Sequence, residues 1–532
     1  MLGRPSNQRH HGGPLTAPDV TVVVAVYNTM PYLEQCLTSL VEQSIGLSRL
    51  QVVAVDDGST DGSGDTLDRF AAAYPSVIEV LHQPNSGGPA APSNRALDVA
   101  TGRYVYFLGA DDYLGTEALE RMVGFADEHD SDVVVGKMIG VNGRGVRQQL
   151  FGSNQVDVDP YGPDLRWAIA NTKLFRRSLV EKHHLRYRED MAFGSDQPFT
   201  LAACVHATRI SVLADYTCYY AVKRDDESNI SFLTTYAARV PCIGQMMQSV
   251  ADLVPAGPHR DTLLTRHFAW EIPRLLGPDL LERPVAEQLD ICAGIRRLAD
   301  QWLSEQIIAD LSASARLRVS AAALEDADLL AAVIRDDSNP ALPVHLEDDQ
   351  AFACYAGFGA SDLPEHLYRV APPAVGNRLS AALHVRTCRW SGRSLVIDLR
   401  LPIIGCQAAT ALSAELRSVK GGQPAGVRTS VVSRVAATGS AVCVKVDRKS
   451  LLAAGPGTWR IHLVGDVAAG RYDVRVPLPP QQPVAHAWRR GRLHRIAVTG
   501  APRGDVLAIT VSPVPAREIV MAAFRRLRSK RK

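Results

Sequence analysis

The sequence DVTVVVAVYN, residues 19–28, is rich in β-branched residues and ends in a tyrosine and an asparagine. Such a run predicts a strand that is buried on both faces. The following segment, residues 31–43, has apolar residues at helical spacing, and residues 50–55 form a second β-rich run. A strand, a helix and a second strand in this order predict a parallel pair within an α/β domain.

The same alternation continues along the chain. We expect helices at residues 60–74 and 89–100 and strands at residues 77–81 and 104–108. Because ligands of parallel sheets bind outside the carboxyl ends of the strands, polar residues at those ends are the candidates for a site.

The remaining sequence changes character twice. Helical spacing predicts four long helices, at residues 237–253, 260–276, 285–303 and 317–334. Short, often alternating runs then predict a β-sandwich, with strands at residues 379–386, 394–401, 411–419, 427–432, 441–446, 458–464, 472–477 and 506–512. The predicted organisation is a disordered N-terminus (1–18), an α/β domain (19–235), a helical linker domain (236–375), a β-sandwich region (376–515) and a basic amphipathic tail (516–532).

Composition excludes several classes of protein. The 58 Lys and Arg residues nearly balance the 56 Asp and Glu residues, so bulk charge gives no indication of nucleic-acid binding. No apolar run approaches the roughly 18 residues that a membrane span needs. The nine cysteines are scattered and contain no C-x-x-C pair, which favours reduced thiols in a cytoplasmic protein.

Polar clusters follow the predicted strands. They are Val26-Tyr27-Asn28, Val55–Asp61 and Phe107–Asp112, with the turn Asn85–Pro89 between the last two. Carboxylates at strand ends can accept hydrogen bonds from a base or ribose, or hold Mg²⁺ or Mn²⁺. Backbone N–H groups of the glycine-rich turn can approach a diphosphate. Each cluster alone is also typical of an ordinary loop or helix cap.

Together these segments resemble the family 2 glycosyltransferases, which have the GT-A fold. The resemblance runs through residues 21–28, 53–61, 85–96, 104–114, 171–176 and 190–199. It implies that a nucleotide-sugar donor binds at the strand ends, with a divalent metal (Mg²⁺ or Mn²⁺). It also implies that an acceptor hydroxyl attacks the anomeric carbon with inversion.

The resemblance assigns roles to individual residues. Tyr27 would lie beside the nucleobase, Asp56 and Asp57 would bind uracil and ribose, and Asp111 with Asp112 would hold the metal. The full implied donor site is Val26, Tyr27, Asn28, Asp56, Asp57, Asn85, Gly87, Gly88, Asn94, Arg95, Ala110, Asp111, Lys223 and Arg224.

Two positions depart from the family pattern. Gly109 stands where the family usually has the first aspartate of its metal motif, and Ser93 stands where it has a phosphate-facing arginine. Arg95 is the candidate to compensate for the second change. Lys223 and Arg224 would balance diphosphate charge, and the alternative for both is a solvated basic loop.

Inversion needs a general base within hydrogen-bond reach of the acceptor hydroxyl. The resemblance assigns this role to Asp196, with Ser195 where the family often has glutamate. Glu189 and Asp190 are the alternative bases. The other interpretation is that Asp196 is only a carboxylate favourably placed at a helix N-terminus.

The three-part layout resembles the polyol-phosphate glycosyltransferases that decorate wall teichoic acid. This implies transfer of a hexose or N-acetylhexosamine from a UDP-sugar to a cell-wall or surface glycopolymer, and a homotrimer formed through the β region. Local basic patches such as Arg144–Arg147 would attract a polyanionic acceptor. The alternatives are a capsule or exopolysaccharide glycosyltransferase, or a carbohydrate-binding assembly protein with a weak catalytic domain.

The C-terminal tail concentrates positive charge. Residues 519–527 have helical spacing, and six of the eight residues from Arg525 to Lys532 are basic. We expect this tail to place a cytoplasmic enzyme at the anionic inner face of the membrane, where lipid-linked acceptors are found. The alternative is a disordered basic tail.

Overall fold

The computed structural model describes residues 17–224, 236–360, 363–404, 412–420, 427–436, 439–489, 492–501, 506–515 and 518. The predictions for the N-terminal residues before 17 and for the tail from residue 519 therefore lie outside the described residues. The chain divides into two compact units. Residues up to Leu275 and Arg283–Asp310 form the first, and Leu276–Glu282 with the chain from Leu311 onward forms the second.

An eight-stranded sheet forms the centre of the first unit, in the order β3-β2-β1-β4-β7-β6-β8-β5. The strands are β1 (Val20–Val26), β2 (Leu50–Asp56), β3 (Ile78–His82), β4 (Tyr104–Phe107), β5 (Tyr113–Leu114), β6 (Val133–Val141), β7 (Leu174–Arg176) and β8 (Ile210–Val222). The half β3-β2-β1-β4 is parallel, as expected. The other half is mixed, because β7 runs antiparallel to β4 and β6, and β5 runs antiparallel to β8.

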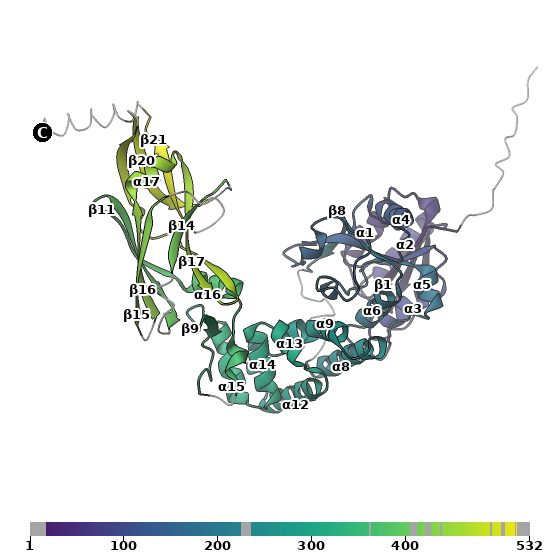
Figure 1. Ribbon diagram of the computed structural model, residues 1–532. Coiled ribbons are helices and arrows are strands. Elements are labelled where there is room, and N and C mark those ends of the chain that lie inside the picture. Colours follow the sequence, from purple (N-terminus) through teal and green to yellow (C-terminus); the bar gives the residue numbers. More distant parts are fainter. Residues whose placement is uncertain are drawn as a thin grey trace, which may run out of the picture. The chain divides into compact units, whose positions relative to one another are not determined.

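Both faces of this sheet are covered by helices (Figure 1). Val22 and Val24 of β1 face a core shared with α1 (Leu33–Val41), α2 (Ser63–Ala73) and α4 (Ala118–His129). Val23 faces the opposite core, which contains residues of α3 (Ala90–Asp98), α5 (Arg177–Lys182) and α6 (Asp196–His206). The alternation of side chains along one strand thus explains why the whole run of β1 is apolar.

Further helices complete the first unit: α8 (Tyr236–Leu253), α9 (Pro258–Arg266), α10 (Ile272–Leu275), α12 (Val285–Trp302) and α13 (Glu305–Asp310). Helix α8 packs on both α6 and α12. The predicted helix at 260–276 is a series in which the π-helical turn η4 (His267–Glu271) joins α9 to α10.

The second unit begins with helices α11 (Pro278–Leu281), α14 (Ala313–Ala323), α15 (Ala327–Asp337) and α16 (Pro372–Ala382). Two sequence predictions are wrong here. The helix predicted at 317–334 is broken at Leu324–Asp326, because Glu325 adopts a φ of 57° and Asp326 caps α15 by accepting from the N–H of Leu329. The strand predicted at 379–386 is helical up to Ala382, after which β11 begins.

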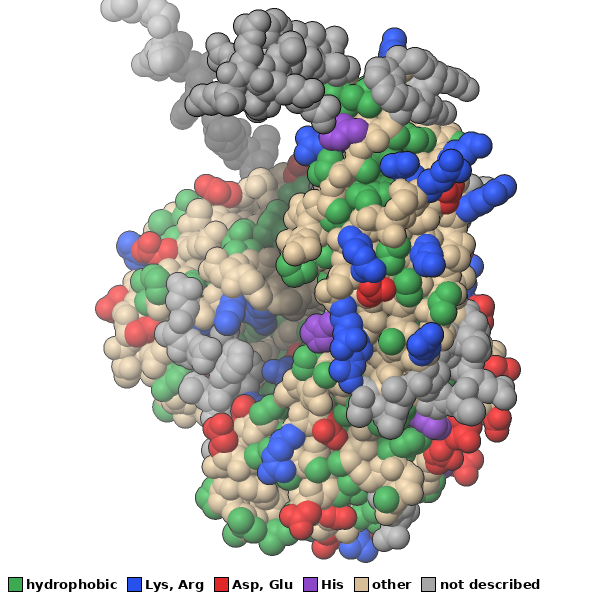
Figure 2. All heavy atoms as spheres, turned by 90° about the vertical axis from the view of Figure 1, so that its left-hand side faces the viewer, with side chains coloured by type: hydrophobic (Ala, Val, Ile, Leu, Met, Phe, Trp, Pro, Cys, Tyr) green, Lys and Arg blue, Asp and Glu red, His purple; other side chains and the backbone are tan. Residues whose placement is uncertain are grey.

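Antiparallel strands form the rest of this unit. One sheet has the order β11-β12-β16-β15 and comprises β11 (His384–Ser391), β12 (Ser394–Leu401), β16 (Gly439–Asp447) and β15 (Thr429–Ala436). The other contains β14 (Ser413–Ser418), β17 (Gly457–Val467), β21 (Leu507–Pro513), β20 (Arg492–Gly500) and β19 (Val484–Arg489), with β18 (Gly470–Arg475) paired to β17. Figure 2 looks onto the β-rich side and shows more basic than acidic side chains over the middle of that face.

Three short strands, β9 (Val344–Glu347), β10 (Gln350–Ala353) and β13 (Ile403–Ile404), form a small separate sheet. Within the described part of the chain, no helix has both the length and the apolar character needed to cross a bilayer.

Candidate active site

The carboxyl ends of β1 to β4 lie along one edge of the parallel half-sheet, and hydrogen bonds join the loops that follow them. Asn28, at a φ of 48°, accepts from the N–H of Thr60 at 2.8 Å and donates its own N–H to Ser59 Oγ at 3.1 Å. Val26 is buried, whereas Tyr27 is 43% exposed, so its ring is open to a ligand at this edge.

Asp56 and Asp57 end the second strand with different partners. Asp56 accepts from the N–H of Ser59 at 3.0 Å and lies 3.0 Å from His82 Nδ1. Asp57 accepts from Gln83 Nε2 at 2.6 Å and from both the N–H and the hydroxyl of Ser86. Both carboxylates are buried. In this structure Asp57 therefore holds the loop after β3, the loop that carries the predicted diphosphate turn.

That turn has open space around it. Asn85 accepts from the N–H of Gly87 at 2.7 Å, and Gly87 has a φ of 87°. A Cβ atom added at Gly87 or Gly88 would meet nothing within 4 Å. The backbone at this turn is accordingly accessible, and the approach of a diphosphate to it remains a prediction.

Asn94 and Arg95 of α3 make contacts that fix loops. The Asn94 side chain donates to Tyr187 O at 3.0 Å and accepts from the N–H of Tyr187 at 2.8 Å. Arg95 donates to His82 O at 2.7 Å. Ser93 is buried. The structure thus gives both residues a supporting position behind the strand ends.

The most direct link across the edge is an ion pair between Asp111 and Arg224. Arg224 Nε donates to Asp111 Oδ2 at 2.8 Å, and both side chains are mostly buried, at 11% and 14% exposed. Arg224 also reaches Asn28 O at 3.5 Å. The predicted metal ligand and the predicted diphosphate-neutralising cation are therefore brought together, while the neighbouring Lys223 is exposed.

Asp112 is differently placed from Asp111. Its Oδ1 accepts from the N–H of Val222 at 2.6 Å, and its Oδ2 accepts from the hydroxyl of Tyr219. Burial and the adjacent Asp111 raise the pKa of Asp112 to about 6. Both of its oxygens are thus used to attach β8 to the end of β4, which leaves Asp111 as the better metal ligand of the predicted pair.

The structure leaves no free space for a side chain at Gly109. A Cβ atom there would lie 2.9 Å from Asp112 Oδ2, 3.1 Å from Tyr219 Oη and 3.3 Å from Asp111 Oδ1. Ala110, which lies between Gly109 and Asp111 in the sequence, is buried. The space that a side chain at position 109 would need is therefore taken by Asp112, Tyr219 and Asp111.

A divalent ion fits the residues that remain. The carboxylate of Asp111 already accepts a guanidinium cation, so the position is suited to positive charge. Mg²⁺ needs only one or two protein carboxylates, because waters and phosphates complete its shell. No cluster of three or more His, Cys, Asp or Glu side chains able to hold a metal occurs among the described residues, so any metal here would depend on the donor phosphates.

Asp196 is the first residue of α6 and is partly buried. Burial raises the pKa of its carboxyl group, whereas Arg266, Lys173 and a backbone hydrogen bond from Asn171 act in the opposite direction. Lys173 is 1% exposed and its ammonium donates to Ala170 O. Burial lowers the pKa of Lys173 to about 8. These cations oppose the protonation that burial alone would cause.

Aromatic packing connects α6 to the donor edge. The ring of Phe107, the last residue of β4, lies 5.3 Å from that of Phe199, one turn after Asp196. Tyr187 stacks on Phe199 at 4.6 Å and receives a hydrogen bond from the Asn171 side chain. The start of α6 is therefore held against the strand whose end carries Asp111.

The alternative bases, Glu189 and Asp190, lie on the surface, and each has a partner there. Glu189 accepts from Asn94 at 2.8 Å, and Asp190 is paired with Arg188 at 2.7 Å. Both are exposed, whereas Asp196 is partly buried. Sequence reasoning missed His82, which bridges Asp56 and Asp68 at 3.0 Å each, because a single histidine at a strand end carries no spacing signal.

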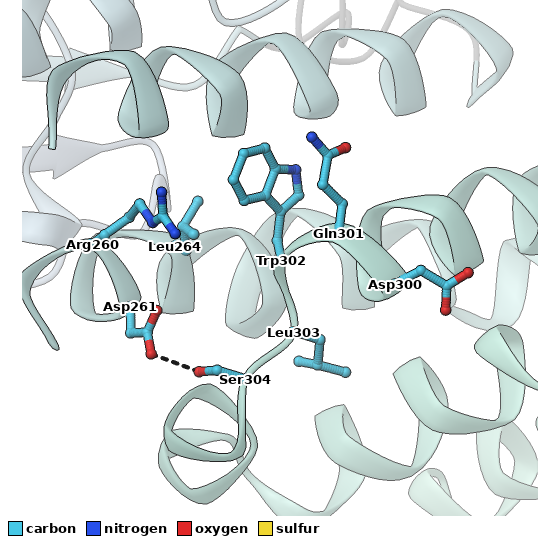
Figure 3. A pocket seen from close by; sticks show the side chains of 8 residues that line it. All are labelled: Arg260, Asp261, Leu264, Asp300, Gln301, Trp302, Leu303 and Ser304. Atoms are coloured by element: carbon cyan, nitrogen blue, oxygen red, sulfur yellow. Dashed lines mark hydrogen bonds between the residues drawn. The ribbon is translucent and has the colours of Figure 1, made fainter. Parts of the chain in front are cut away.

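A separate pocket of about 170 Å³ lies among the helices of the first unit (Figure 3). Trp302 and Arg260 line it, and Ser304 donates to Asp261 at 2.7 Å on one side. Small-molecule sites usually measure about 300–1,000 Å³. This pocket is too small for a nucleotide-sugar and contains none of the predicted site residues.

Comparison with known proteins gives two family matches. Residues 21–184 match the model described as Glycosyl transferase family 2, and residues 240–334 match that of the Glycosyl transferase TarS linker domain. The first match contains the predicted donor residues of β1 to β4, and the second contains α9 with Arg266.

Individual proteins of Bacillus spizizenii and Staphylococcus aureus are similar to parts of this chain. The chain is 39% identical over 208 residues to a poly(ribitol-phosphate) beta-glucosyltransferase of Bacillus spizizenii, which covers 39% of this chain and 33% of that protein. It is 38% identical over 256 residues to the poly(ribitol-phosphate) beta-N-acetylglucosaminyltransferase TarS of Staphylococcus aureus, covering 47% and 44%. The matched segments thus span less than half the length of these relatives.

Solved structures extend the likeness of fold. The crystal structure of S. aureus TarS aligns with a TM-score of 0.61 at 22% identity, over 94% of this chain and 86% of that chain. A shorter TarS fragment in complex with UDP-GlcNAc aligns with a TM-score of 0.56 at 28% identity, over 63% and 97%. The order of an α/β domain, a helical segment and β-rich sheets agrees with the fold predicted from the sequence.

Proposed function

Because residues 21–184 belong to glycosyltransferase family 2, we propose that this protein transfers a sugar from a UDP-sugar to a hydroxyl of a polyol-phosphate wall polymer. The transferred sugar is glucose or N-acetylglucosamine, the sugars named for the similar proteins of B. spizizenii and S. aureus. The observation that carries the proposal is the packing of Phe107 on Phe199, which joins the strand before Asp111 to the helix that begins with Asp196.

The donor would bind at the edge formed by β1 to β4. The exposed ring of Tyr27 can stack on the base, and Asp56 can accept from the nucleoside. The open backbone at Gly87 and Gly88 can approach the diphosphate. Asp111 would hold a divalent ion, which when bound supplies positive charge for the departing UDP. Arg224 and Lys223 can supply further positive charge at the same place.

Asp196 would act as general base on the acceptor hydroxyl. A carboxylate of raised pKa is a stronger base, and nearby cations favour its ionised form. Arg266 and Lys173 have this effect on Asp196. One-step attack on the face opposite to UDP then inverts the anomeric centre.

A direct test is a screen of UDP-glucose and UDP-GlcNAc with poly(ribitol phosphate) as acceptor, with and without Mn²⁺. We expect UDP release that depends on the acceptor and labelled sugar in the polymer. Release of UDP without incorporation, or no release from either donor, would contradict the proposal. The Asp196→Asn variant is the matched negative control.

A further inference from the structure

Two tryptophans and two arginines alternate on the surface of the first unit. We call this set, Trp167, Arg147, Trp270 and Arg274, the Arg–Trp series. The Arg147 guanidinium lies 3.7 Å from the Trp167 ring centre and 5.3 Å from that of Trp270. The Arg274 guanidinium lies 5.3 Å from the Trp270 ring. The loop after β6, the 3₁₀ turn η3 (Leu165–Trp167), η4 and α10 each contribute one residue.

The outer members of the series are accessible. Trp270 is 41% exposed, and Arg147 and Arg274 are exposed as well. Exposed arginines stacked on an exposed indole ring are typical of recognition surfaces, because each group offers both a flat face and hydrogen-bond donors.

Positive charge accumulates behind the series. Arg166 and Arg266 lie 5.5 and 6.0 Å from the Trp167 ring, and each has one acidic partner, Asp310 at 3.8 Å and Glu271 at 3.1 Å. Each of these ion pairs neutralises one of the inner arginines, and neither pair includes Arg147 or Arg274.

Among the ion pairs of the described residues, none involves Arg147 or Arg274. Burial and repulsion from Arg266 and Arg166 lower the pKa of Arg147. The outer surface therefore has an excess of positive charge that a bound anion would neutralise.

The series begins close to the proposed base. Gln197, the residue after Asp196, donates to Glu271 at 3.4 Å, and Glu271 pairs with Arg266 at 3.1 Å. The Arg266 guanidinium lies 6.0 Å from the Trp167 ring and acts to lower the pKa of Asp196. A polymer whose reacting hydroxyl is at Asp196 would have neighbouring units within reach of this surface.

We propose that the Arg–Trp series is a second acceptor subsite, which binds phosphodiester-linked polyol units adjacent to the unit that is glycosylated. This inference rests on the proposed function. Guanidinium groups pair with phosphate oxygens through two parallel hydrogen bonds, and indole faces pack against C–H groups. An alternation of cations and rings suits a polymer in which phosphodiesters alternate with polyols. Docking on a membrane is less favoured, because Trp270 is the one large apolar side chain of the series that is exposed.

The test compares Arg147→Gln, Arg274→Gln and Trp270→Ala with the intact protein, using long poly(ribitol phosphate) and a single ribitol phosphate as acceptors. The measured quantity is the ratio of kcat/KM for the long acceptor to that for the short one. We expect each substitution to lower this ratio about tenfold through the KM of the long chain. The salt dependence of that KM should also weaken, because fewer charges are neutralised on binding.

Arg121→Ala is the matched control, because Arg121 is also an exposed arginine, stacked 4.8 Å from the ring of Tyr216. In this control variant, the ratio of kcat/KM for the long acceptor to that for the short one should stay at the wild-type value. An unchanged ratio in all three test variants, or equal losses with long and short acceptors, would overturn the proposal.

Direct binding separates this inference from the proposed function. If the protein transfers no sugar to either acceptor, sedimentation with poly(ribitol phosphate) still tests the surface, and binding that Arg147→Gln abolishes supports it. Loss of binding to phosphatidylglycerol vesicles with unchanged binding to the polymer would show a membrane surface and overturn the subsite. Melting temperatures of the variants verify that each protein is folded.

Discussion

The guanidinium of Arg224 donates to the carboxylate of Asp111 at 2.8 Å, so the cation that follows β8 covers the carboxylate that follows β4. Both side chains are largely buried, which strengthens their interaction relative to a surface pair. A divalent ion at Asp111 must share or replace this contact. The pair would therefore link a metal bound at Asp111 to the segment after β8.

Arg224→Ala removes the ion pair with Asp111 and should affect kcat and the affinity for Mn²⁺ in opposite directions. We expect kcat to fall about 10²-fold, because a preorganised positive charge near the diphosphate is lost. The apparent affinity for Mn²⁺ in the presence of UDP should rise, because the ion no longer competes with the guanidinium for Asp111. Titration of Mn²⁺ followed by calorimetry measures the second effect.

The control for Arg224 is Arg103→Ala, which breaks an ion pair with Asp127 at 2.9 Å, next to the start of β4. This variant should bind Mn²⁺ as the wild type does. A lower affinity for Mn²⁺ in Arg224→Ala would show that the pair organises the site rather than competing for it.

Asp196→Asn should reduce kcat by about 10²–10⁴-fold and leave the KM for the UDP-sugar nearly unchanged, because the amide cannot accept the proton. Burial raises the pKa of Asp196, so activity should fall with decreasing pH at a value above that of an ordinary aspartate. A pH profile of kcat/KM checks this. Activity within a few-fold of wild type would remove Asp196 as the base, and Glu189→Gln serves as the control.

Lys173→Met should change how the free energy of unfolding depends on pH. The pKa of Lys173 is lowered from 10.5 to about 8, so between these pH values the unfolded chain binds more protons than the folded one. Wild-type stability should therefore rise relative to that of the methionine variant from about pH 8 to pH 10.5. Chemical denaturation at pH 7 and pH 10 measures the difference.

The same substitution removes a cation that lowers the pKa of Asp196. The acid limb of the activity profile should move to higher pH. An acid limb that stays in place would show that Lys173 has a structural role without influence on the base.

The parallel half-sheet was predictable because each strand is a continuous apolar run, and such runs have few alternative structures. Strands β9 and β10 were missed because each has four residues and their turn is Asp348-Asp349, with φ values of 46° and 59°. Turns of this kind usually contain Asn-Gly or Asp-Gly, so the sequence gives no hairpin signal.

That some of the candidate site residues lie together was predictable from the sequence, whereas most of their individual contacts were not. The family resemblance brought Asp111 and Arg224 into one site, and the structure pairs them. The internal partners of Asp57 and Asp112 could not be predicted, because Ser86 and Tyr219 approach them only once the sheet has formed. Hydrogen bonds between residues that are far apart in the chain leave no periodic pattern in the sequence.

His82→Ala tests the support of Asp56, the carboxylate that we propose accepts from the nucleoside. Hydrogen bonds with Asp56, and then with Asp68, raise the pKa of His82. The stability from these pairs is complete below the ordinary histidine pKa of 6.5 and is lost as the pH rises through the raised value. The difference in melting temperature between wild type and His82→Ala should thus be largest at acidic pH. The KM for the UDP-sugar should increase a few-fold, and an unchanged KM would show that Asp56 needs no support.

Gly109→Asp restores the carboxylate that the family motif usually has, and we expect it to impair the protein. The new Cβ would lie 2.9 Å from Asp112 Oδ2 and 3.3 Å from Asp111 Oδ1, so both crowding and like charge oppose it. The free energy of unfolding should fall by about 1–3 kcal/mol, as for overpacked cores. Gly124→Ala is the control, because a Cβ there meets nothing within 4 Å. Unchanged stability with stronger stimulation by Mn²⁺ would instead mean that position 109 can accept a ligand, and that Tyr219 gives way to it.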